Sequence, residues 1–565
     1  MTSESTVFES LPGSPLGRMP YPLRRLPVFR ADVLVVGSGV AGLATALAAA
    51  ETGGHVMVLS KGRITDTNTH YAQGGIAAAV GPDDDVVLHA SDTLNLGYGL
   101  SDPLIVAAIT SAAPAAMEWL ADSGMAFDRE STGRFSLGKE GGHSMPRILH
   151  SGGTTTGKEL QRVLAARANQ HPHIDIYSYT TAVELLKDAD GAVCGLVALA
   201  RQGSDGIYTP VLFEADSVVM ATGRGGQIFR ETTNPQLATA DGLAMALRAG
   251  ATLRDLEFVQ FHPTILYLAG AARFLISEVV RGEGAVLRDR QGYAFMPEFH
   301  ADADLAPRDV VSRAIFRRIV DAGDTNVFLD LARVAEPAKR FPALARIASE
   351  FGISIGVDPI PVRPAVHYFV GGIAANLEGR TSLEGLYAVG ECASTGFHGA
   401  NRMGSNSLLE GLVHGRLVGA RILEQKHSGR RFLSPHLSED YGAPAAELNL
   451  TDMTYSLKSL TWRQVGIERD AAGLLDAQQR LDTWANYLER LGPFTPEGVE
   501  VMNMVQVAQV ITRSATFRKE SRGAHFRSDF PERNEQWRVH SRLETTPGGL
   551  RISPELVPDS PWQHC

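Results

Sequence analysis

The chain has 565 residues, a formal net charge of −10 at pH 7 and three cysteines. This length exceeds what one ordinary hydrophobic core supports, so we expect two or three domains. A hydrophobic fraction of 44% and a charged fraction of 21% are typical of a soluble globular protein, and the sequence predicts no membrane span. The negative charge disfavours a general nucleic-acid binder. The scattered cysteines indicate neither a disulfide framework nor a metal site.

The N-terminal segment, residues 1–29, is rich in Ser and Pro, so we predict that it is disordered. An apolar, β-branched run at residues 32–36 then predicts a strand buried on both faces. The following Gly37-Ser38-Gly39-Val40-Ala41-Gly42 opens a helix, whose N-terminus favours phosphate. Its glycines permit a tight turn, close approach of a pyrophosphate and close helix packing. With a second strand at residues 55–59, this unit indicates a dinucleotide site.

The residues after the second strand narrow the choice of dinucleotide. An NAD site usually has an acidic residue here, whereas this chain has Ser60-Lys61. The basic residue leaves NADP possible. The next segment, residues 68–76, is glycine-rich and polar, which favours the larger cofactor FAD.

Periodicity predicts the remaining elements. Helices are expected at residues 103–123, 156–169, from 241, and at 409–424, 455–491 and 497–517, and strands at 174–179, 192–200 and 217–221. The βαβ pattern is lost between Leu256 and Tyr368, which we interpret as an inserted cap. We therefore predict an α/β fold with a Rossmann-like, discontinuous FAD-binding domain (30–255 and 371–440). An α+β capping domain (256–370) is inserted into it, and a C-terminal helical domain with an irregular tail follows (441–565).

Short motifs recur along the chain in one order. They are Gly37 to Gly42, Ala72-Gln73-Gly74-Gly75-Ile76, Gln260-Phe261-His262-Pro263-Thr264, Arg281-Gly282-Glu283-Gly284, Ala306-Pro307-Arg308-Asp309, His367-Tyr368, Gly399-Ala400-Asn401-Arg402 and Glu520 to His525. Over residues 30–535 they resemble the flavoprotein family of succinate dehydrogenase, fumarate reductase and L-aspartate oxidase. The resemblance implies an FAD-dependent oxidoreductase that acts on a small dicarboxylate.

Two departures within the family favour L-aspartate over succinate as the substrate. The dehydrogenase and fumarate reductase subunits carry a flavin-linking histidine five residues before the Gln of the AQGG motif. That position here is Asn68, and His70 is out of register, so we expect FAD to be bound without a covalent bond. The loop Glu140-Gly141-Gly142-His143 resembles one whose carboxylate faces the substrate amino group, which succinate lacks.

The resemblance also implies roles for individual side chains. Arg402 would grip one substrate carboxylate with two parallel hydrogen bonds. His262 and His367 would bind substrate, and Arg308 would transfer the proton. Because free arginine is a poor base, we expect a desolvated, cation-rich pocket to lower the pKa of Arg308. Hydrogen bonds to the other carboxylate are expected from Ser277, Gln260 and Ser405, and Glu140 is expected to bind the amino group.

The same resemblance, together with the glycine turn, implies the FAD contacts. They are Gly37, Ser38, Gly39, Val40, Ala41, Gly42, Lys61, Asn68, Thr69, His70, Tyr71, Ala72, Gln73, Gly74, Gly75, Asp241, Glu391, Ser407 and Leu408. No metal site is expected.

The implied reaction is oxidation of L-aspartate to iminoaspartate, with oxygen or fumarate as the electron acceptor. It would be the first step of NAD biosynthesis through quinolinate, in the cytoplasm, with a functional link to quinolinate synthase. A soluble fumarate reductase or a succinate dehydrogenase flavoprotein subunit is the alternative. An FAD-binding RNA-associated protein is disfavoured by the net charge and by the Arg and His set.

Overall fold

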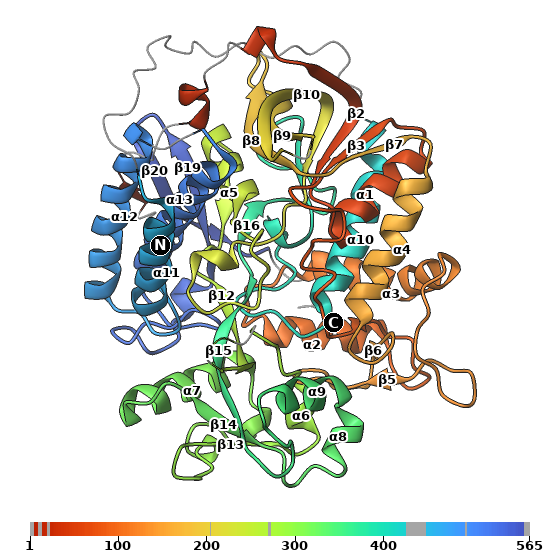
Figure 1. Cartoon of the computed structure of the whole chain (residues 1–565), viewed down its shortest axis with the longest axis vertical. Coiled ribbons are helices and arrows are strands. Elements are labelled where there is room, and N and C mark those ends of the chain that lie inside the picture. The colour runs from red at the N-terminus through yellow and green to blue at the C-terminus, as the bar shows by residue number, and fades with distance from the viewer. Residues whose placement is uncertain are drawn as a thin grey trace.

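A mixed seven-stranded sheet carries the glycine turn (Figure 1). The computed structural model describes residues 5–8, 14–19, 23–203, 205–268, 270, 273–424, 448–491 and 494–558. The sheet has the order β7 (Ile174–Tyr177), β3 (Val56–Leu59), β2 (Val28–Val36), β10 (Ile207–Met220), β9 (Val193–Gln202) and β8 (Thr180–Lys187). Strand β17 (Leu386–Ala388) pairs in parallel with the end of β10. The fold is α/β, as predicted.

The last four residues of β2, Val33 to Val36, are buried on both faces, which explains the continuous apolar run there. Val33 and Val35 pack in one cluster with helices α1 (Val40–Glu51), α3 (Pro103–Asp122), α4 (Thr156–Gln170) and α10 (Asn406–Arg421). Leu34 and Val36 pack in a second cluster on the opposite face. Alternate residues of a strand point to opposite faces of the sheet, so one strand serves both cores.

Helices α1 and α10 run parallel and pack with almost no side chain between them. A Cβ atom at Gly411 would lie 2.8 Å from Val40, one at Gly415 would lie 2.6 Å from the Ala41 carbonyl oxygen, and one at Gly419 would lie 2.3 Å from the Thr45 carbonyl oxygen. These glycines, spaced one helical turn apart, let the two backbones approach closely. Both helices begin at the edge of the same cavity, described below.

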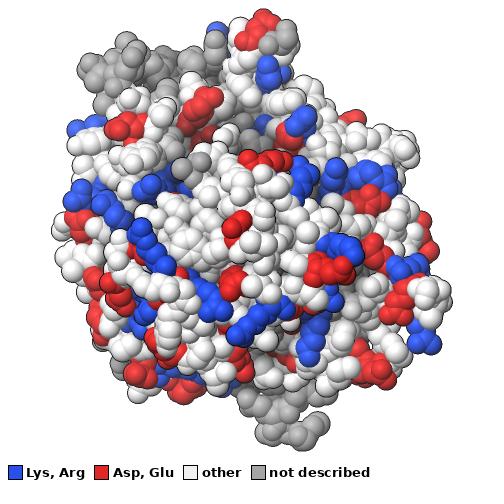
Figure 2. Space-filling view, turned by 60° about the horizontal axis from the view of Figure 1, so that its bottom comes forward, with Lys and Arg blue, Asp and Glu red and all other residues white. Residues whose placement is uncertain are grey.

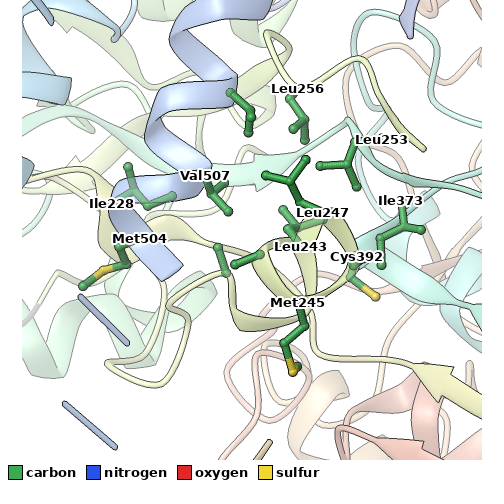
Figure 3. Packing of buried hydrophobic residues seen from close by; sticks show 14 of the residues in the cluster. Ile228, Leu243, Met245, Leu247, Leu253, Leu256, Ile373, Cys392, Met504 and Val507 are labelled. Carbon is green, nitrogen blue, oxygen red and sulfur yellow. The ribbon is translucent and has the colours of Figure 1, made fainter. Parts of the chain in front are cut away.

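The second cluster joins the sheet to the C-terminal helices α11 (Leu450–Gln464), α12 (Ala471–Leu491) and α13 (Pro496–Phe517). Figure 3 shows its centre, where Leu243 and Leu247 of α5 (Asp241–Ala249) lie near Val507 of α13 and Ile373. Cys392 is buried there and donates to the Met220 carbonyl oxygen, so it behaves as a small core residue.

The cap contains a four-stranded antiparallel sheet of its own, which runs from β12 near the middle of Figure 1 down to β13 and β14 at the bottom. Its order is β12 (Val259–Leu266), β15 (Ile360–Phe369), β14 (Val327–Asp330) and β13 (Val286–Arg288). Helices α6 (Val279–Gly282), α7 (Arg308–Ala322), α8 (Pro337–Arg340) and α9 (Pro342–Glu350) belong to the same segment, and a separate apolar cluster fills it. These elements all fall within the interval expected for the cap.

Two predictions about the chain ends are wrong. The tail expected to be irregular forms an antiparallel hairpin, β19 (Val539–Thr546) and β20 (Gly549–Leu556). Within residues 1–29, β1 (Thr6–Phe8) pairs with β20, and Leu16, Met19 and Leu23 are buried, so these parts are ordered. The ends lie in one sheet, β1-β20-β19-β11-β16-β18, with β11 (Leu253–Arg254), β16 (Gly372–Ala374) and β18 (Ala393–Ser394). The predicted boundary near residue 440 falls outside the described residues.

Helix α3 is apolar and long enough to cross a membrane by length and composition alone. Ile105, Val106, Ile109 and Met117 of this helix are instead buried in the cluster against α1, α4 and α10. Such burial is typical of a core helix. Helix α2 (Val86–Leu96) packs against α3. A small separate sheet has the order β4 (Ile76–Ala77), β6 (Ile148–Leu149) and β5 (Leu137–Gly138).

Candidate functional site

One cavity of about 1460 Å³ lies between the glycine turn and the cap. Its nucleotide end is lined by Gly37 to Ala41, Lys61 and Asp241, and its other end by Glu140, His262, Arg308, His367 and Arg402. Of the predicted site residues, Gly42, His70 and Gln260 alone do not line this cavity among the described residues. The structure therefore brings the predicted cofactor and substrate residues together.

The nucleotide end depends on glycine geometry. Gly37 has a φ of +115°, and a Cβ atom there would lie 2.2 Å from the Ala221 carbonyl oxygen at the end of β10. Gly42 lies behind the turn, where a Cβ atom would be 2.0 Å from the Gly37 carbonyl oxygen. Gly42 thus serves helix packing, as expected for the third glycine, and does not contact the cavity.

Lys61 lines the cavity, but its ammonium is already engaged by the protein. It donates to Thr239 Oγ1 at 2.6 Å and to Asp241 Oδ2 at 2.8 Å, and it pairs with Glu500 Oε1 at 2.5 Å. These three partners, with the Leu237 carbonyl oxygen at 3.4 Å as a fourth, occupy all three donors of the ammonium. Glu500 belongs to α13, so Lys61 joins the C-terminal helices to the nucleotide end.

Glu391, predicted to contact FAD, lies beside an arginine that the sequence did not single out. Arg224 Nη2 is 2.5 Å from Glu391 Oε2, and another Arg224 nitrogen donates to the His367 carbonyl oxygen. Burial raises the pKa of Glu391 to about 7 although Arg224 opposes the shift. Arg224 lines the cavity, and its buried Nε finds no hydrogen-bond partner in the described chain.

Arg402 is buried at the other end of the cavity, and neighbouring side chains fix the position of its guanidinium. Its Nη2 donates to Ser407 Oγ at 2.8 Å and its Nη1 to Gln260 Oε1 at 3.3 Å, while the guanidinium lies 4.8 Å from the centre of the Tyr368 ring. Its Nε has no partner in the described chain. Burial, and then the Arg308 charge, lower the pKa of Arg402 to about 10. Arg402 is therefore still a cation at pH 7, poised for an anion.

Gln260 supports Arg402 rather than facing the cavity. Its Nε2 donates to Asn401 Oδ1 at 2.8 Å and to the Arg402 carbonyl oxygen at 2.7 Å, and the residue is fully buried. The predicted direct hydrogen bond from Gln260 to a substrate is thus not supported by its position. Ser277 and Ser405 do line the cavity.

The rings of His262 and His367 meet edge to face, with their centres 5.4 Å apart. Burial first, and then the charges of Arg308, Arg281 and Arg402, hold the pKa of His262 well below its usual value. The Thr264 N–H donates to His262 Nδ1 at 3.3 Å, so the proton of the neutral ring is on Nε2. Burial likewise lowers the pKa of His367 well below its usual value, and Thr233 Oγ1 lies 3.1 Å from its Nδ1. Both rings are neutral and suited to hydrogen bonding.

Arg308, the first residue of α7, is paired with a carboxylate that the sequence did not identify. Its Nε donates to Glu278 Oε2 at 2.7 Å, and Arg281 Nη2 lies 3.7 Å from Glu278 Oε1. Burial lowers the pKa of Arg308, but Glu278 and Glu140 outweigh it, so the net shift is upward. The expectation of a lowered pKa for Arg308 is therefore wrong, because carboxylates rather than cations dominate its surroundings. Its Nη1 has no partner in the described chain.

Glu140 is buried against the start of α10. Its Oε2 accepts from Ser405 Oγ at 2.9 Å. A Cβ atom at Gly404 would lie 2.3 Å from Glu140 Oε2 and 3.0 Å from Arg308 Nη2, so both side chains pack on a bare backbone. His143 anchors the Glu140 loop through a 3.0 Å hydrogen bond between its Nε2 and the Gly404 carbonyl oxygen. The site thus places an anion among its cations.

Sequence reasoning missed Glu278, Arg224 and Thr233. Glu278 directly follows the predicted Ser277 and precedes Arg281 by one helical turn, a spacing that favours ion pairing. Arg224 lies within Gly223-Arg224-Gly225-Gly226, directly after β10, where such strand ends carry ligand contacts. No local pattern indicates Thr233, whose partner His367 is 134 residues away.

The residues present fit FAD. The glycine turn and the helix N-termini of α1 and α10 suit phosphate and ring oxygens. Gly37 and Arg402 line one and the same cavity, so a dinucleotide bound at the glycine turn can reach the cationic end. Gly39, Gly74 and Gly223 present backbone without a side chain along this path.

Comparison with known proteins agrees with this geometry. A family model described as FAD binding domain matches residues 32–408, and one described as fumarate reductase flavoprotein C-term matches residues 454–562. The chain is 41% identical to the L-aspartate oxidase of Nostoc sp., covering 91% of this chain and 93% of that protein. It is 40% identical to the L-aspartate oxidase of Streptomyces coelicolor, covering 92% of each.

Solved structures of the wider family share the fold. A variant of the quinol fumarate reductase of E. coli superposes with a TM-score of 0.87 at 30% identity, covering 95% of this chain and 98% of that one. The Sdh1 complex of Mycobacterium smegmatis superposes with a TM-score of 0.81 at 31% identity, covering 95% and 96%.

Proposed function

The chain belongs to the L-aspartate oxidases, within the flavoprotein family of succinate dehydrogenase and fumarate reductase, and from this premise we propose how its site acts on L-aspartate. FAD is the cofactor, and the reaction is oxidation of L-aspartate to iminoaspartate. This reaction is the first step of NAD biosynthesis through quinolinate. Oxygen or fumarate is the proposed electron acceptor, and quinolinate synthase the proposed next enzyme. We place the enzyme in the cytoplasm.

The observation that carries this proposal is the buried Glu140 carboxylate beside Arg308, in the cavity that Arg402 also lines. The two arginines have unpartnered donors, Nη1 and Nε respectively, which suit two carboxylates. A site for succinate needs no further charge. A carboxylate among these cations suits an ammonium, which L-aspartate has and succinate lacks.

The side chains then divide the work. Arg402 and the Nε2–H of His262 hold carboxylate oxygens, and Glu140 holds the amino group, so that Cα has one orientation. The glycine turn would hold FAD, which would supply the two-electron acceptor for the oxidation at Cα. Arg308 is proposed to relay the proton that leaves the substrate. As one of its terminal nitrogens takes that proton, its Nε passes one to Glu278 Oε2 at 2.7 Å, so the guanidinium stays a cation. His262 and Glu140 are buried, which shields this end of the cavity in part from bulk water.

The test is anaerobic reduction of the purified holoenzyme. L-aspartate should bleach the flavin absorption within seconds to minutes, while an equal concentration of succinate should leave it oxidised. Bleaching by succinate and not by L-aspartate would favour a succinate dehydrogenase or fumarate reductase instead. The same sample, precipitated with acid, should release its flavin into the supernatant, because Asn68 cannot form the histidyl link.

A further inference from the structure

The loop Glu520 to His525 lies outside the cavity lining, yet it packs against the loop that carries Arg402. We propose that residues 520–525 are positioning residues for Arg402 and thereby set the affinity for the substrate carboxylate. This inference rests on the proposed role of Arg402 in binding a dicarboxylate. It assigns a task at the active site to the C-terminal domain.

The peptide groups of Ala400 are held on two sides by segments distant in sequence. The Ala400 N–H donates to the Gly97 carbonyl oxygen at 2.9 Å, and the Ala400 carbonyl oxygen accepts from the Ala524 N–H at 3.0 Å. Gly97 follows helix α2, and Ala524 belongs to the C-terminal domain. Ala400 is two residues before Arg402, so these two bonds fix the backbone from which the arginine projects.

The backbone contacts on both sides of the Arg402 loop leave no room for a side chain. Gly523 has a φ of +52°, and a Cβ atom there would lie 2.4 Å from the Ala400 carbonyl oxygen. On the other side, a Cβ atom at Gly399 would lie 2.4 Å from the Gly97 carbonyl oxygen. The Arg402 loop is thus clamped between two bare backbones, and it cannot shift toward either one.

The 520–525 loop is itself rigid. The buried Arg522 donates from Nε to Glu520 Oε1 at 2.7 Å, from Nη1 to the Tyr98 carbonyl oxygen at 2.6 Å and from Nη2 to the Asn534 carbonyl oxygen at 3.1 Å. His525 Nδ1 accepts from Arg469 Nη1 at 2.7 Å, which leaves its Nε2–H to donate to the Arg518 carbonyl oxygen at 3.4 Å. A loop whose charged groups are buried and paired in this way is a firm support.

The clamp reaches the Arg402 guanidinium through Asn401. Asn401 Oδ1 accepts from Gln260 Nε2, and Gln260 Oε1 in turn accepts from Arg402 Nη1 at 3.3 Å. Asn401 Nδ2 donates to Asp309 Oδ1 at 3.2 Å, next to Arg308. A displacement of the 399–402 backbone would therefore misalign Arg402 and disturb its register with Arg308.

The experiment is Gly523→Ala in the full-length holoenzyme, with Gly323→Ala as the matched control. Gly323 has a similar φ of +62°, but a Cβ atom there meets nothing within 4 Å. The dissociation constant of succinate, used as a redox-inert dicarboxylate probe, is measured by perturbation of the flavin spectrum. We expect Gly523→Ala to raise it about 10-fold or more and to raise KM for L-aspartate by a similar factor, with a smaller change in kcat. Gly323→Ala should match the wild type.

General destabilisation would lower the fraction of folded, flavin-loaded protein but leave the dissociation constant of the remaining sites unchanged. An unchanged constant in Gly523→Ala would therefore overturn the positioning role. If that variant does not fold, Arg522→Lys keeps a cation beside Glu520 and removes the bond to the Tyr98 carbonyl oxygen. It should raise the constant by a smaller factor, and an unchanged value would again contradict the proposal. Failure of the wild type to bind any dicarboxylate would instead refute the proposed function.

Discussion

At the scale of single residues, each ionisable group around the substrate has a neighbour that sets its charge or its orientation. Glu278 keeps Arg308 charged, and Thr264 places the proton of His262 on Nε2. Gln260 orients the guanidinium of Arg402 by accepting a hydrogen bond from it. The site therefore needs little rearrangement to receive a dianionic skeleton. Such preorganisation reduces the cost of binding and of reaching the transition state.

Glu140 should distinguish substrates that have an amino group from those that do not. Glu140→Gln keeps the side-chain size and its bond to Ser405 but removes the charge. A charge-assisted hydrogen bond contributes about 1.5–3 kcal/mol, so kcat/KM for L-aspartate should fall roughly 10- to 100-fold. Fumarate reduction should be unchanged or faster, because a repelling charge is gone. Equal losses for both substrates would mean that Glu140 only shapes its loop.

Arg308 should be required for turnover but not for FAD binding. Arg308→Leu should lower kcat for L-aspartate by about 10²-fold or more, the usual scale for a lost proton-transfer group. The flavin content, read from the absorbance ratio, should stay at the wild-type level. Because the substitution leaves Glu278 buried without its partner, Arg308→Lys is the control that preserves the ion pair. Wild-type turnover in Arg308→Leu would remove Arg308 from the mechanism.

The sequence predicted most of these residues because they lie in short motifs whose chemistry is recognisable. It missed those whose role depends on distant contacts. Thr233 contacts His367 because β15 lies beside the segment that contains Thr233 in the folded chain. Arg224 pairs with Glu391, which is 167 residues further along the chain. The charge environment of Arg308 was misjudged for the same reason, since Glu140 and Glu278 come from different segments.

At the scale of elements, the glycine turn between β2 and α1 was predictable because its constraint is local. The structure adds that Gly37 also packs on β10, a strand that ends about 180 residues later. The C-terminal hairpin was missed although Pro547-Gly548-Gly549 is a turn signal between two runs containing Leu and Ile or Val. Polar residues in both strands obscured their alternation, because the hairpin buries only part of each face.

Gly37→Ala should abolish FAD binding. The new methyl group would lie 2.2 Å from the Ala221 carbonyl oxygen, so either the turn or the end of β10 must move. Gly53→Ala, in the same βαβ unit, has a comparable φ of +95° and no atom within 4 Å of its Cβ position. We expect the first variant to be purified without flavin and the second with a full complement. Full flavin in both would show that the turn tolerates a side chain.

At the scale of the whole molecule, the chain ends tie the domains together. Asp255 and Glu257, where the cap segment begins, accept from Ser541 of β19, and the buried Arg518 donates to Glu257 Oε1 at 2.6 Å. The surface in Figure 2 has acidic and basic side chains interspersed, so charge on that face is not segregated into a single patch.

Removal of the hairpin should destabilise the molecule as a unit. A chain ending at Arg538 leaves Asp255 and Glu257 without their partners in β19, and each buried polar group left unpaired costs about 1–3 kcal/mol. We expect a loss of soluble holoenzyme, or a melting temperature lower by several degrees. A chain ending at Pro558 retains the hairpin and is the control. Equal melting temperatures for the two truncated chains would mean that β19 does not stabilise the core.

The parallel packing of α1 and α10 also fixes a distance along the active-site cavity. Helix α1 begins at the phosphate end of the cavity and α10 at the carboxylate end, and glycine-to-backbone contact prevents either helix from sliding along the other. The packing of α1 on α10 therefore fixes the distance between their N-termini. The distance between the phosphates of the cofactor and the carboxylate held by Arg402 would then be set by the fold, while the cap residues His262 and Arg308 orient the substrate within it.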